Sequence, residues 1–272
     1  MKFELHCHSH YSRGKKIPVE GLDSPSEIVK FAKKSGIDGI ALTDHYTNKG
    51  WKEAKEACRK NGLVFVPAIE ISSIGGHIIG LGLNDFVQSG LSVEETLEKI
   101  QEQGAVSVAA HPFDIRREGL KERSVKADVI EVFNSMNLDR FSNYLAKKLA
   151  EKMEKPFVSG SDAHTKEMLG ASINYVDGFD VESVLKEIRK GRARFFGRYM
   201  DIEKLLPWVK KRMLMSYGEI LKYADANYPE PKRWVSKRLL HSFVSSKREG
   251  FWYILGEAGL AGARAYGFLK ML

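Results

Sequence analysis

The 272-residue sequence has few cysteines and no long apolar run, and each absence limits the class of protein. Two cysteines, Cys7 and Cys58, provide no disulfide framework and are typical of a reducing compartment, so we expect a cytoplasmic protein. No stretch of 18 or more uncharged apolar residues occurs, so no membrane-spanning helix is expected. The strand-like opening residues also lack the pattern of a signal peptide.

The net charge of +8 is concentrated in the last third of the chain. From residue 191 onward there are 16 Lys and Arg against 7 Asp and Glu, whereas the preceding part is nearly neutral. Such a surplus favours a polyanionic partner such as nucleic acid. Solvated helix faces carry similar charge in many proteins, so the sequence leaves both interpretations open. It does not predict the oligomeric state.

Strand-like and helix-like segments alternate about seven times between residues 2 and 197. Capping boxes at Ser24–Glu27 and Ser92–Glu95 mark the starts of two of the helices. This order predicts an α/β fold with a mainly parallel sheet, and the number of units favours a closed barrel. From about residue 199 three helical segments are expected, over 202–226, 231–246 and 250–272. We therefore expect a barrel over residues 1–198 and a basic helical appendage over 199–272.

Metal-ligand types of side chain follow the ends of several predicted strands. His6 and His8 end the first strand, and two positions apart in an extended chain they point to the same side. The others are Asp44, His45, Glu70, His111, Asp162 and His164, with His77 at the start of its strand. Barrel enzymes build their sites where strands end, and imidazoles with carboxylates are typical ligands of divalent metals. The sequence therefore predicts a metal centre of two or more ions.

Seven segments resemble the motifs of the PHP (polymerase and histidinol phosphatase) family, in the family's order. They are L-H-C-H-S, A-L-T-D-H, A-I-E-I-S, H-I-I-G-L, A-A-H-P-F, I-E-V-F-N and G-S-D-A-H. The resemblance covers about residues 2–197 and implies a distorted (β/α)7 TIM-like barrel with two or three zinc, manganese or iron ions. It implies a first ion held by His6, His8, Glu70 and Asp162, a second bridged by Glu70 and held by His77 and His111, and a third held by His45 and His164.

One position departs from the pattern of that family. After H-x-H-S the family usually continues Ser-Asp-Gly, with the acid serving the third ion, whereas this chain has Ser12-Arg13-Gly14. Arginine cannot ligate a metal. The third site is therefore expected to be weak or empty, or to be completed by His10 or a water. Arg13 is alternatively a phosphate-binding residue or a plain surface side chain.

Other residues near the strand ends have two interpretations each. Asp44 precedes a predicted ligand and is either an orienting residue or a general base. Asn134 either orients the substrate or a water, or caps the next turn. Arg116 and Arg117 follow His111 and either bind an anionic substrate or are solvated.

The predicted activity is hydrolysis of a phosphate ester, from a small phosphorylated metabolite or a nucleotide, with a metal-bound hydroxide as nucleophile. The expected catalytic carboxylates are Asp44, Glu70 and Asp162, and the expected substrate contacts are Arg13, Arg116 and Asn134. Two alternatives stay open. The same centre polarises a carbonyl, which suits an amidohydrolase, and the basic C-terminal region suits a nuclease module that binds nucleic acid.

Overall fold

The computed structural model describes residues 1–14, 17–116 and 118–270, and within them the chain forms a nine-stranded sheet in the order β7-β6-β5-β4-β3-β2-β1-β8-β9. The strands are β1 (Lys2–Cys7), β2 (Gly39–Leu42), β3 (Val64–Ser73), β4 (Gly76–Leu81), β5 (Val106–Ala109), β6 (Val129–Asn134), β7 (Phe157–Gly160), β8 (Ser172–Tyr175) and β9 (Arg194–Gly197). The helices before residue 200 are α1 (Pro25–Lys34), α2 (Trp51–Asn61), α3 (Val93–Glu102), α4 (Phe141–Lys152) and α5 (Val181–Arg189), with two short 3₁₀ turns, Lys121–Lys126 and Lys166–Met168.

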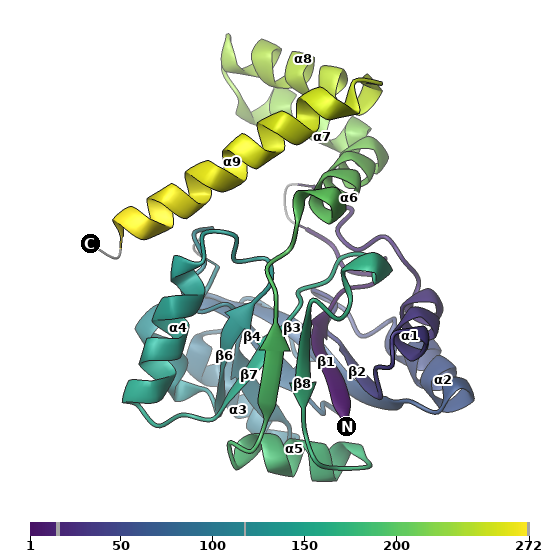
Figure 1. Cartoon of the computed structure of the whole chain (residues 1–272), viewed down its shortest axis with the longest axis vertical. Helices are drawn as coiled ribbons and strands as arrows, with labels where there is room; N and C mark the ends of the chain where they lie inside the picture. Colours follow the sequence, from purple (N-terminus) through teal and green to yellow (C-terminus); the bar gives the residue numbers. More distant parts are fainter. Residues whose placement is uncertain (15–16, 117, 271–272) are drawn as a thin grey trace.

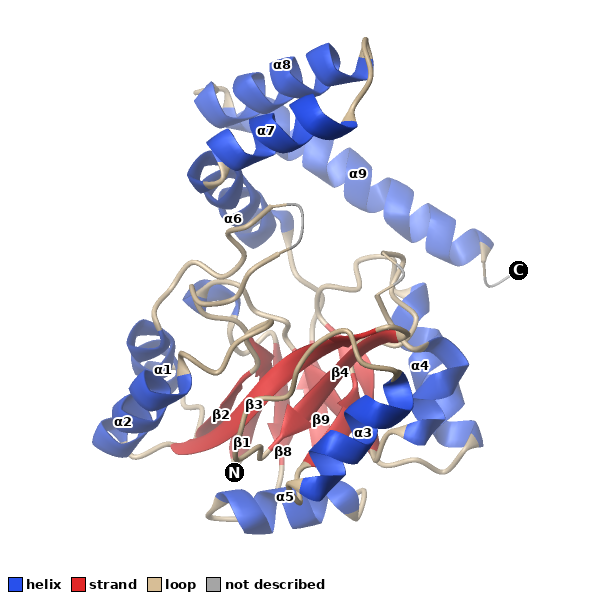
Figure 2. Cartoon of the chain, turned by 180° about the vertical axis from the view of Figure 1, so that it is seen from behind, coloured by secondary structure: helices blue, strands red, loops and turns tan. Residues whose placement is uncertain are grey.

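The sheet is mixed instead of mainly parallel, with four parallel and four antiparallel strand pairs, and it curls until its ends almost meet (Figure 2). Strands β1, β2 and β3 run parallel, as do β5, β6 and β7, whereas β4 is antiparallel to both of its neighbours and β8 is antiparallel to β1 and β9. Beyond the end of β7, Ala163 forms a parallel bridge with Cys7, and the N–H of His8 donates to the Ala163 carbonyl at 2.8 Å. The expected distorted TIM-like barrel is therefore confirmed, and its distortion lies in β4 and β8.

Helices cover the outside of the barrel, with α1 and α2 on one flank and α4 on the other (Figure 1). The two predicted capping boxes are present, since Ser24 caps α1 with Glu27 and Ser92 caps α3 with Glu95. The barrel interior is filled by apolar side chains from many strands, among them Phe3, Leu5, Val66, Ile79 and Val108. This packing holds the strand ends, and the side chains that follow them, in fixed positions.

The C-terminal region consists of helices α6 (Ile202–Met215), α7 (Tyr217–Asn227), α8 (Lys232–Ser245) and α9 (Glu249–Leu269). The single helix expected over 202–226 is wrong, because the chain breaks at Ser216, whose hydroxyl accepts a hydrogen bond from the N–H of Val19 at 3.0 Å. Figure 1 places these helices beyond the end of the barrel opposite the N-terminus. Among the described residues, no helix combines the length and apolarity needed to cross a bilayer.

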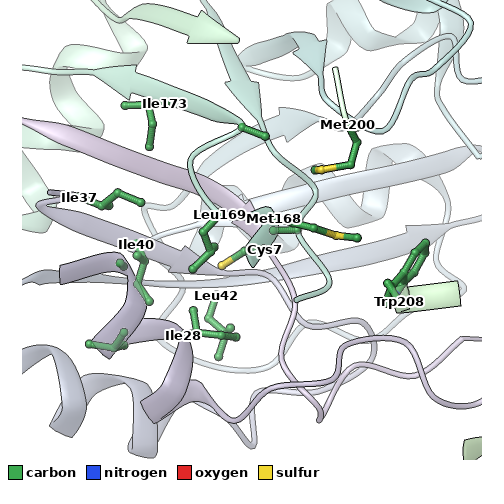
Figure 3. Close-up of a cluster of buried hydrophobic side chains, with 14 of the residues drawn as sticks. Cys7, Ile28, Ile37, Ile40, Leu42, Met168, Leu169, Ile173, Met200 and Trp208 are labelled. Carbon is green, nitrogen blue, oxygen red and sulfur yellow. The ribbon is translucent and has the colours of Figure 1, made fainter. Parts of the chain in front are cut away.

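Close packing at two places helps to attach this region to the barrel. Trp208 of α6 is buried in one apolar cluster with Cys7, Leu169 and Met200 (Figure 3). On α9, a Cβ at Gly267 would lie 2.3 Å from the Asp139 carbonyl oxygen, so only glycine allows this close approach. The helices therefore lie against the end of the barrel at which the strands finish.

Candidate metal centre

The eight predicted ligands come together at the end of the barrel that faces α6. All of them are buried, although transferring an ionisable group from water to the protein interior costs much free energy. They are His6, His8, His45, Glu70, His77, His111, Asp162 and His164. Most of them lie at or just after strand ends, and His77 lies at the start of β4, as the sequence predicted. Glu70 differs, because β3 continues past it to Ser73 and the residue lies within the strand.

Glu70 lies at the centre of the cluster. Its two carboxylate oxygens face different sets of imidazoles. Oε1 lies 2.8 Å from His111 Nε2 and 2.9 Å from His77 Nδ1. Oε2 lies 3.1 Å from His6 Nε2 and 3.3 Å from the Nε2 atoms of both His8 and His45. Although burial alone raises the pKa of Glu70, the facing histidines hold it well below its usual value, so the group is a carboxylate.

Two of the eight residues have strained backbones. His111 has φ of 26° and Asp162 has φ of 52°, both in the region that non-glycine residues rarely adopt. The strain is offset by bonds to the site itself. The N–H of His111 donates to Glu131 Oε2 at 2.6 Å, and Asp162 Oδ1 lies 3.3 Å from His8 Nε2. Such strain concentrates at functional sites, where it holds side chains in place.

The cluster fits divalent metal ions. Four groups of three ligand-type residues have their donor atoms within 4.8 Å of one another. Among the described residues, no group completes a hydrogen bond to the buried His8 Nε2, which faces the cluster and would be costly to bury without a ligand. Burial lowers the pKa of His45 to about 4 and, with His8 nearby, that of His164 to about 3, so both offer lone pairs at neutral pH. Imidazole and carboxylate donors suit zinc, manganese or iron.

Hydrogen bonds behind the cluster orient its imidazoles. His6 Nδ1 donates to Glu131 Oε1 at 2.8 Å, His164 Nδ1 donates to the Asp162 carbonyl at 2.8 Å, and His45 Nδ1 donates to the Glu70 carbonyl at 3.3 Å. Since a carboxylate or carbonyl oxygen only accepts, Nδ1 carries the proton and Nε2 presents its lone pair to the centre. Glu131 was not predicted as a site residue; the available signal was an acid inside the apolar strand V-I-E-V-F-N.

A cavity of about 350 Å³ opens onto the cluster and is lined by three arginines. Arg13 and Arg116, both expected substrate contacts, line it together with Arg212 of α6, which the sequence analysis did not single out. The Arg116 guanidinium is positioned by Asp114 Oδ2 at 3.0 Å and Glu118 Oε2 at 3.3 Å. Arg117 lies outside the described residues.

Two other expected residues lie away from the cavity. Asn134 is fully buried, and its Nδ2 donates to Glu131 Oε2 at 3.0 Å and to Asp162 Oδ2 at 3.4 Å. Asp44 uses both carboxylate oxygens to accept hydrogen bonds of 2.6 Å from the N–H and hydroxyl of Ser9. The structure therefore places Asn134 behind the ligands, and it places Asp44 where it holds the turn that follows His8.

Sequence comparison assigns the chain to a family. A model of the PHP domain matches residues 4–109, and one of the PHP-associated region matches residues 140–193. An uncharacterised protein of Methanocaldococcus jannaschii is 40% identical over 166 residues, 58% of this chain and 96% of the relative. The chain belongs to the PHP family. The resemblance drawn from the seven motifs is therefore confirmed.

Other PHP relatives have named activities. A 5'-3' exoribonuclease of Haemophilus influenzae is 32% identical over 111 residues, 39% of this chain and 38% of that protein. A 3',5'-nucleoside bisphosphate phosphatase of Chromobacterium violaceum is 34% identical over 116 residues, again 39% and 38% of the two chains. The match thus spans about two fifths of these enzymes. In fold, a Bacteroides vulgatus protein containing a predicted PHP-like metal-dependent phosphoesterase matches with a TM-score of 0.60 at 18% identity, covering 77% of this chain and 69% of that one.

Proposed function

We propose that this PHP protein hydrolyses phosphate esters of small phosphorylated metabolites or nucleotides. Membership of the PHP family and its phosphoesterase relatives support a metal-dependent phosphoesterase. The observation that carries the substrate class is the cavity, which places three arginines around the open side of a cluster of metal ligands. Guanidinium groups pair with phosphate oxygens through two parallel hydrogen bonds, so this lining favours a phosphorylated substrate over a neutral amide.

The proposed ligand roles follow the distances in the cluster. Glu70 would bridge two ions, because each of its oxygens faces a different set of imidazoles. The first ion would be held by His6, His8, Glu70 and Asp162, the second by Glu70, His77 and His111, and a third by His45 and His164. Such ions lower the pKa of a bound water toward neutrality and neutralise charge on phosphoryl oxygens.

The remaining side chains would bind and orient. Arg13, Arg116 and Arg212 would hold the phosphoryl oxygens and the rest of an anionic substrate at the mouth of the cluster. Asn134 would orient Asp162, and Asp44 would fix the turn after His8, so we assign both to positioning instead of direct contact with substrate.

We also propose a cytoplasmic location. Both cysteines are free and buried, and burial raises the pKa of the Cys58 thiol to about 12. Free thiols that form no disulfide are typical of a reducing compartment.

Elemental analysis paired with turnover tests the proposal. The purified chain is stripped with a chelator, reloaded with Mn²⁺, Zn²⁺ or Fe²⁺, and assayed on p-nitrophenyl phosphate, on bis-p-nitrophenyl phosphate and on a p-nitroanilide amide. We expect two or more ions per chain and metal-dependent release from a phosphate ester, with Glu70→Gln and Asp162→Asn inactive. Amide cleavage without phosphate release would favour the amidohydrolase, and full turnover by Glu70→Gln would refute the proposed centre.

The exoribonuclease relative and the basic C-terminal region keep a nuclease as the second candidate. Labelled single-stranded RNA and DNA separate the two. A nuclease binds them with an affinity that falls steeply as salt rises, because counterions are released from the phosphates. A phosphatase that acts on small molecules shows no such binding at low salt.

A further inference from the structure

The loop between β1 and α1 carries an acid, Glu20, close to the metal-ligand cluster. Arg13 occupies the position where the family pattern has the acidic residue of the third ion, and its side chain is exposed. Glu20, seven residues further on, turns its carboxylate into the same cavity that His45 and His164 line. Its side chain is only 15% exposed, which is unusual for a loop glutamate without a full salt bridge.

The distance from Glu20 to His45 suits two ligands of one ion. Glu20 Oε2 lies 3.8 Å from His45 Nε2, too far for a hydrogen bond. Two ligand atoms that share one zinc at about 2.1 Å lie about 3 to 4 Å apart. Both His45 and His164 donate through Nδ1 to backbone carbonyls, so the Nε2 lone pair of each is free for such an ion.

Glu20 is held in this orientation from two sides. The hydroxyl of Ser12 donates to Glu20 Oε2 at 3.1 Å, and a guanidinium nitrogen of Arg212 lies 4.0 Å from Oε1. The carbonyl of Glu20 accepts a hydrogen bond of 2.8 Å from Trp208 Nε1, whose ring packs 4.7 Å from that of His164. Helix α6 therefore fixes the loop and one of the imidazoles together.

The neighbouring residue Val19 is fixed by the same helical region. Its carbonyl accepts from Arg212 Nε at 3.0 Å, and its N–H donates to Ser216 Oγ at 3.0 Å. The alternative ligand His10 is exposed, its ring lies 4.3 Å from that of Tyr11 in a tilted arrangement, and it is not among the described residues that line the cavity. Among the described residues of this loop, Glu20 is the one that brings a carboxylate to the cavity.

We propose that Glu20 completes the third ion site with His45 and His164, and that Trp208 of α6 is the positioning residue that holds it there. This inference rests on the proposed metal centre. It gives the C-terminal helical region a defined task, because two hydrogen bonds join the loop that carries Glu20 to α6 and a third joins it to Ser216, directly after α6.

Metal counting on the full chain tests the inference without an activity assay. The stripped protein is titrated with Mn²⁺ by calorimetry, and the saturated, desalted protein is analysed for manganese by mass spectrometry. We expect three ions for the natural sequence and two for Glu20→Gln, with the third dissociation constant raised more than about 100-fold, beyond the 10–100-fold typical of a residue that only orients a ligand. Glu118→Gln removes a carboxylate from the same cavity and is the matched control, with three ions expected.

The outcomes separate the two proposals. If Glu20→Gln binds three ions with unchanged affinities, Glu20 is not a ligand, but the proposed metal centre is unaffected. The same conclusion follows if the natural sequence binds only two ions. No bound metal in the natural sequence would overturn the proposed metal centre itself.

A second variant is used if Glu20→Gln does not fold, as judged by its melting temperature with chelator. This variant is Trp208→Phe. That change keeps the ring beside His164 but removes the donor to Glu20, so the third ion should bind about 10-fold more weakly while the other two are unaffected; unchanged binding of the third ion would overturn the inference.

Discussion

Nδ1 of His6, the ring nitrogen that does not face Glu70, lies 2.8 Å from Glu131 Oε1. Both residues are buried, so the hydrogen bond is shielded from water and fixes the tautomer of the imidazole. The second oxygen of Glu131 accepts the N–H of His111, a residue with a strained backbone. One carboxylate behind the cluster therefore orients two of its ligands.

Replacing Glu131 by Gln should weaken metal binding without removing any ligand. An amide is neutral and supports the His6 proton less well, so we expect metal affinity and turnover to fall about 10–100-fold. Calorimetric titration with Mn²⁺ and phosphate release measure the two effects. Glu151→Gln on the exposed face of α4 is the control and should change neither, because Glu151 is half exposed and, among the described residues, pairs with lysines of its own helix. Unchanged metal affinity in Glu131→Gln would show that His6 needs no such support.

Side-chain alternation in a strand was sufficient to predict that His6 and His8 face the same way, and strand ends of a parallel barrel were sufficient to bring the distant ligands together. Glu20 had no comparable signal. It lies in a loop without periodicity, and its position depends on Trp208, 188 residues further along the chain. Ser216, at the break between α6 and α7, likewise accepts a hydrogen bond from Val19, a residue remote in the sequence. Contacts through space set these features, and no local pattern encodes them.

Metal binding should stabilise the fold measurably. Six imidazoles and two carboxylates are buried together, and an ion that binds only the folded chain adds about 2.7 kcal/mol at a concentration 100 times its dissociation constant. For a chain of this size that corresponds to a rise in melting temperature of about 5–10 °C per site. Differential scanning fluorimetry with chelator and with Mn²⁺ measures it. Asp162→Asn should show a smaller rise, and equal melting temperatures with and without metal would contradict a pre-formed centre.

Arg116→Gln should impair substrate binding and leave the metal centre intact. Its guanidinium lines the cavity and lies 3.9 Å from Asp162 Oδ2, so it is placed to meet an anion bound at the ligands. A charge-assisted hydrogen bond contributes about 1.5–3 kcal/mol, which corresponds to a roughly 10–100-fold loss of kcat/KM. Arg123→Gln removes an arginine that pairs with Glu94 on the surface and is the control. A loss of manganese in Arg116→Gln would instead assign this residue to the support of the metal ligands.

The Cys58 thiol should make the stability of the protein fall at alkaline pH. Burial raises its pKa from 9.0 to about 12 in the folded chain. Between these values the folded state keeps the proton and the unfolded state loses it, so the free energy of unfolding decreases as pH rises. The contribution of the Cys58 thiol to the free energy of unfolding is complete below pH 9 and is lost progressively up to about pH 12. At pH 10, one unit above the unfolded pKa, the loss is about 1.4 kcal/mol.

Urea unfolding of the natural chain and of Cys58→Ala at pH 7 and pH 10 isolates this effect. The alanine variant is less stable at pH 7 because it leaves a cavity where a fully buried side chain was, but that cost does not depend on pH. The stability gap between the two proteins should therefore narrow by about 1.4 kcal/mol at pH 10, since only the natural chain has the Cys58 thiol to titrate. Cys7 is present in both proteins, so its effect cancels in the difference between their stabilities. A constant gap would mean that the Cys58 thiol ionises inside the folded protein as readily as in water.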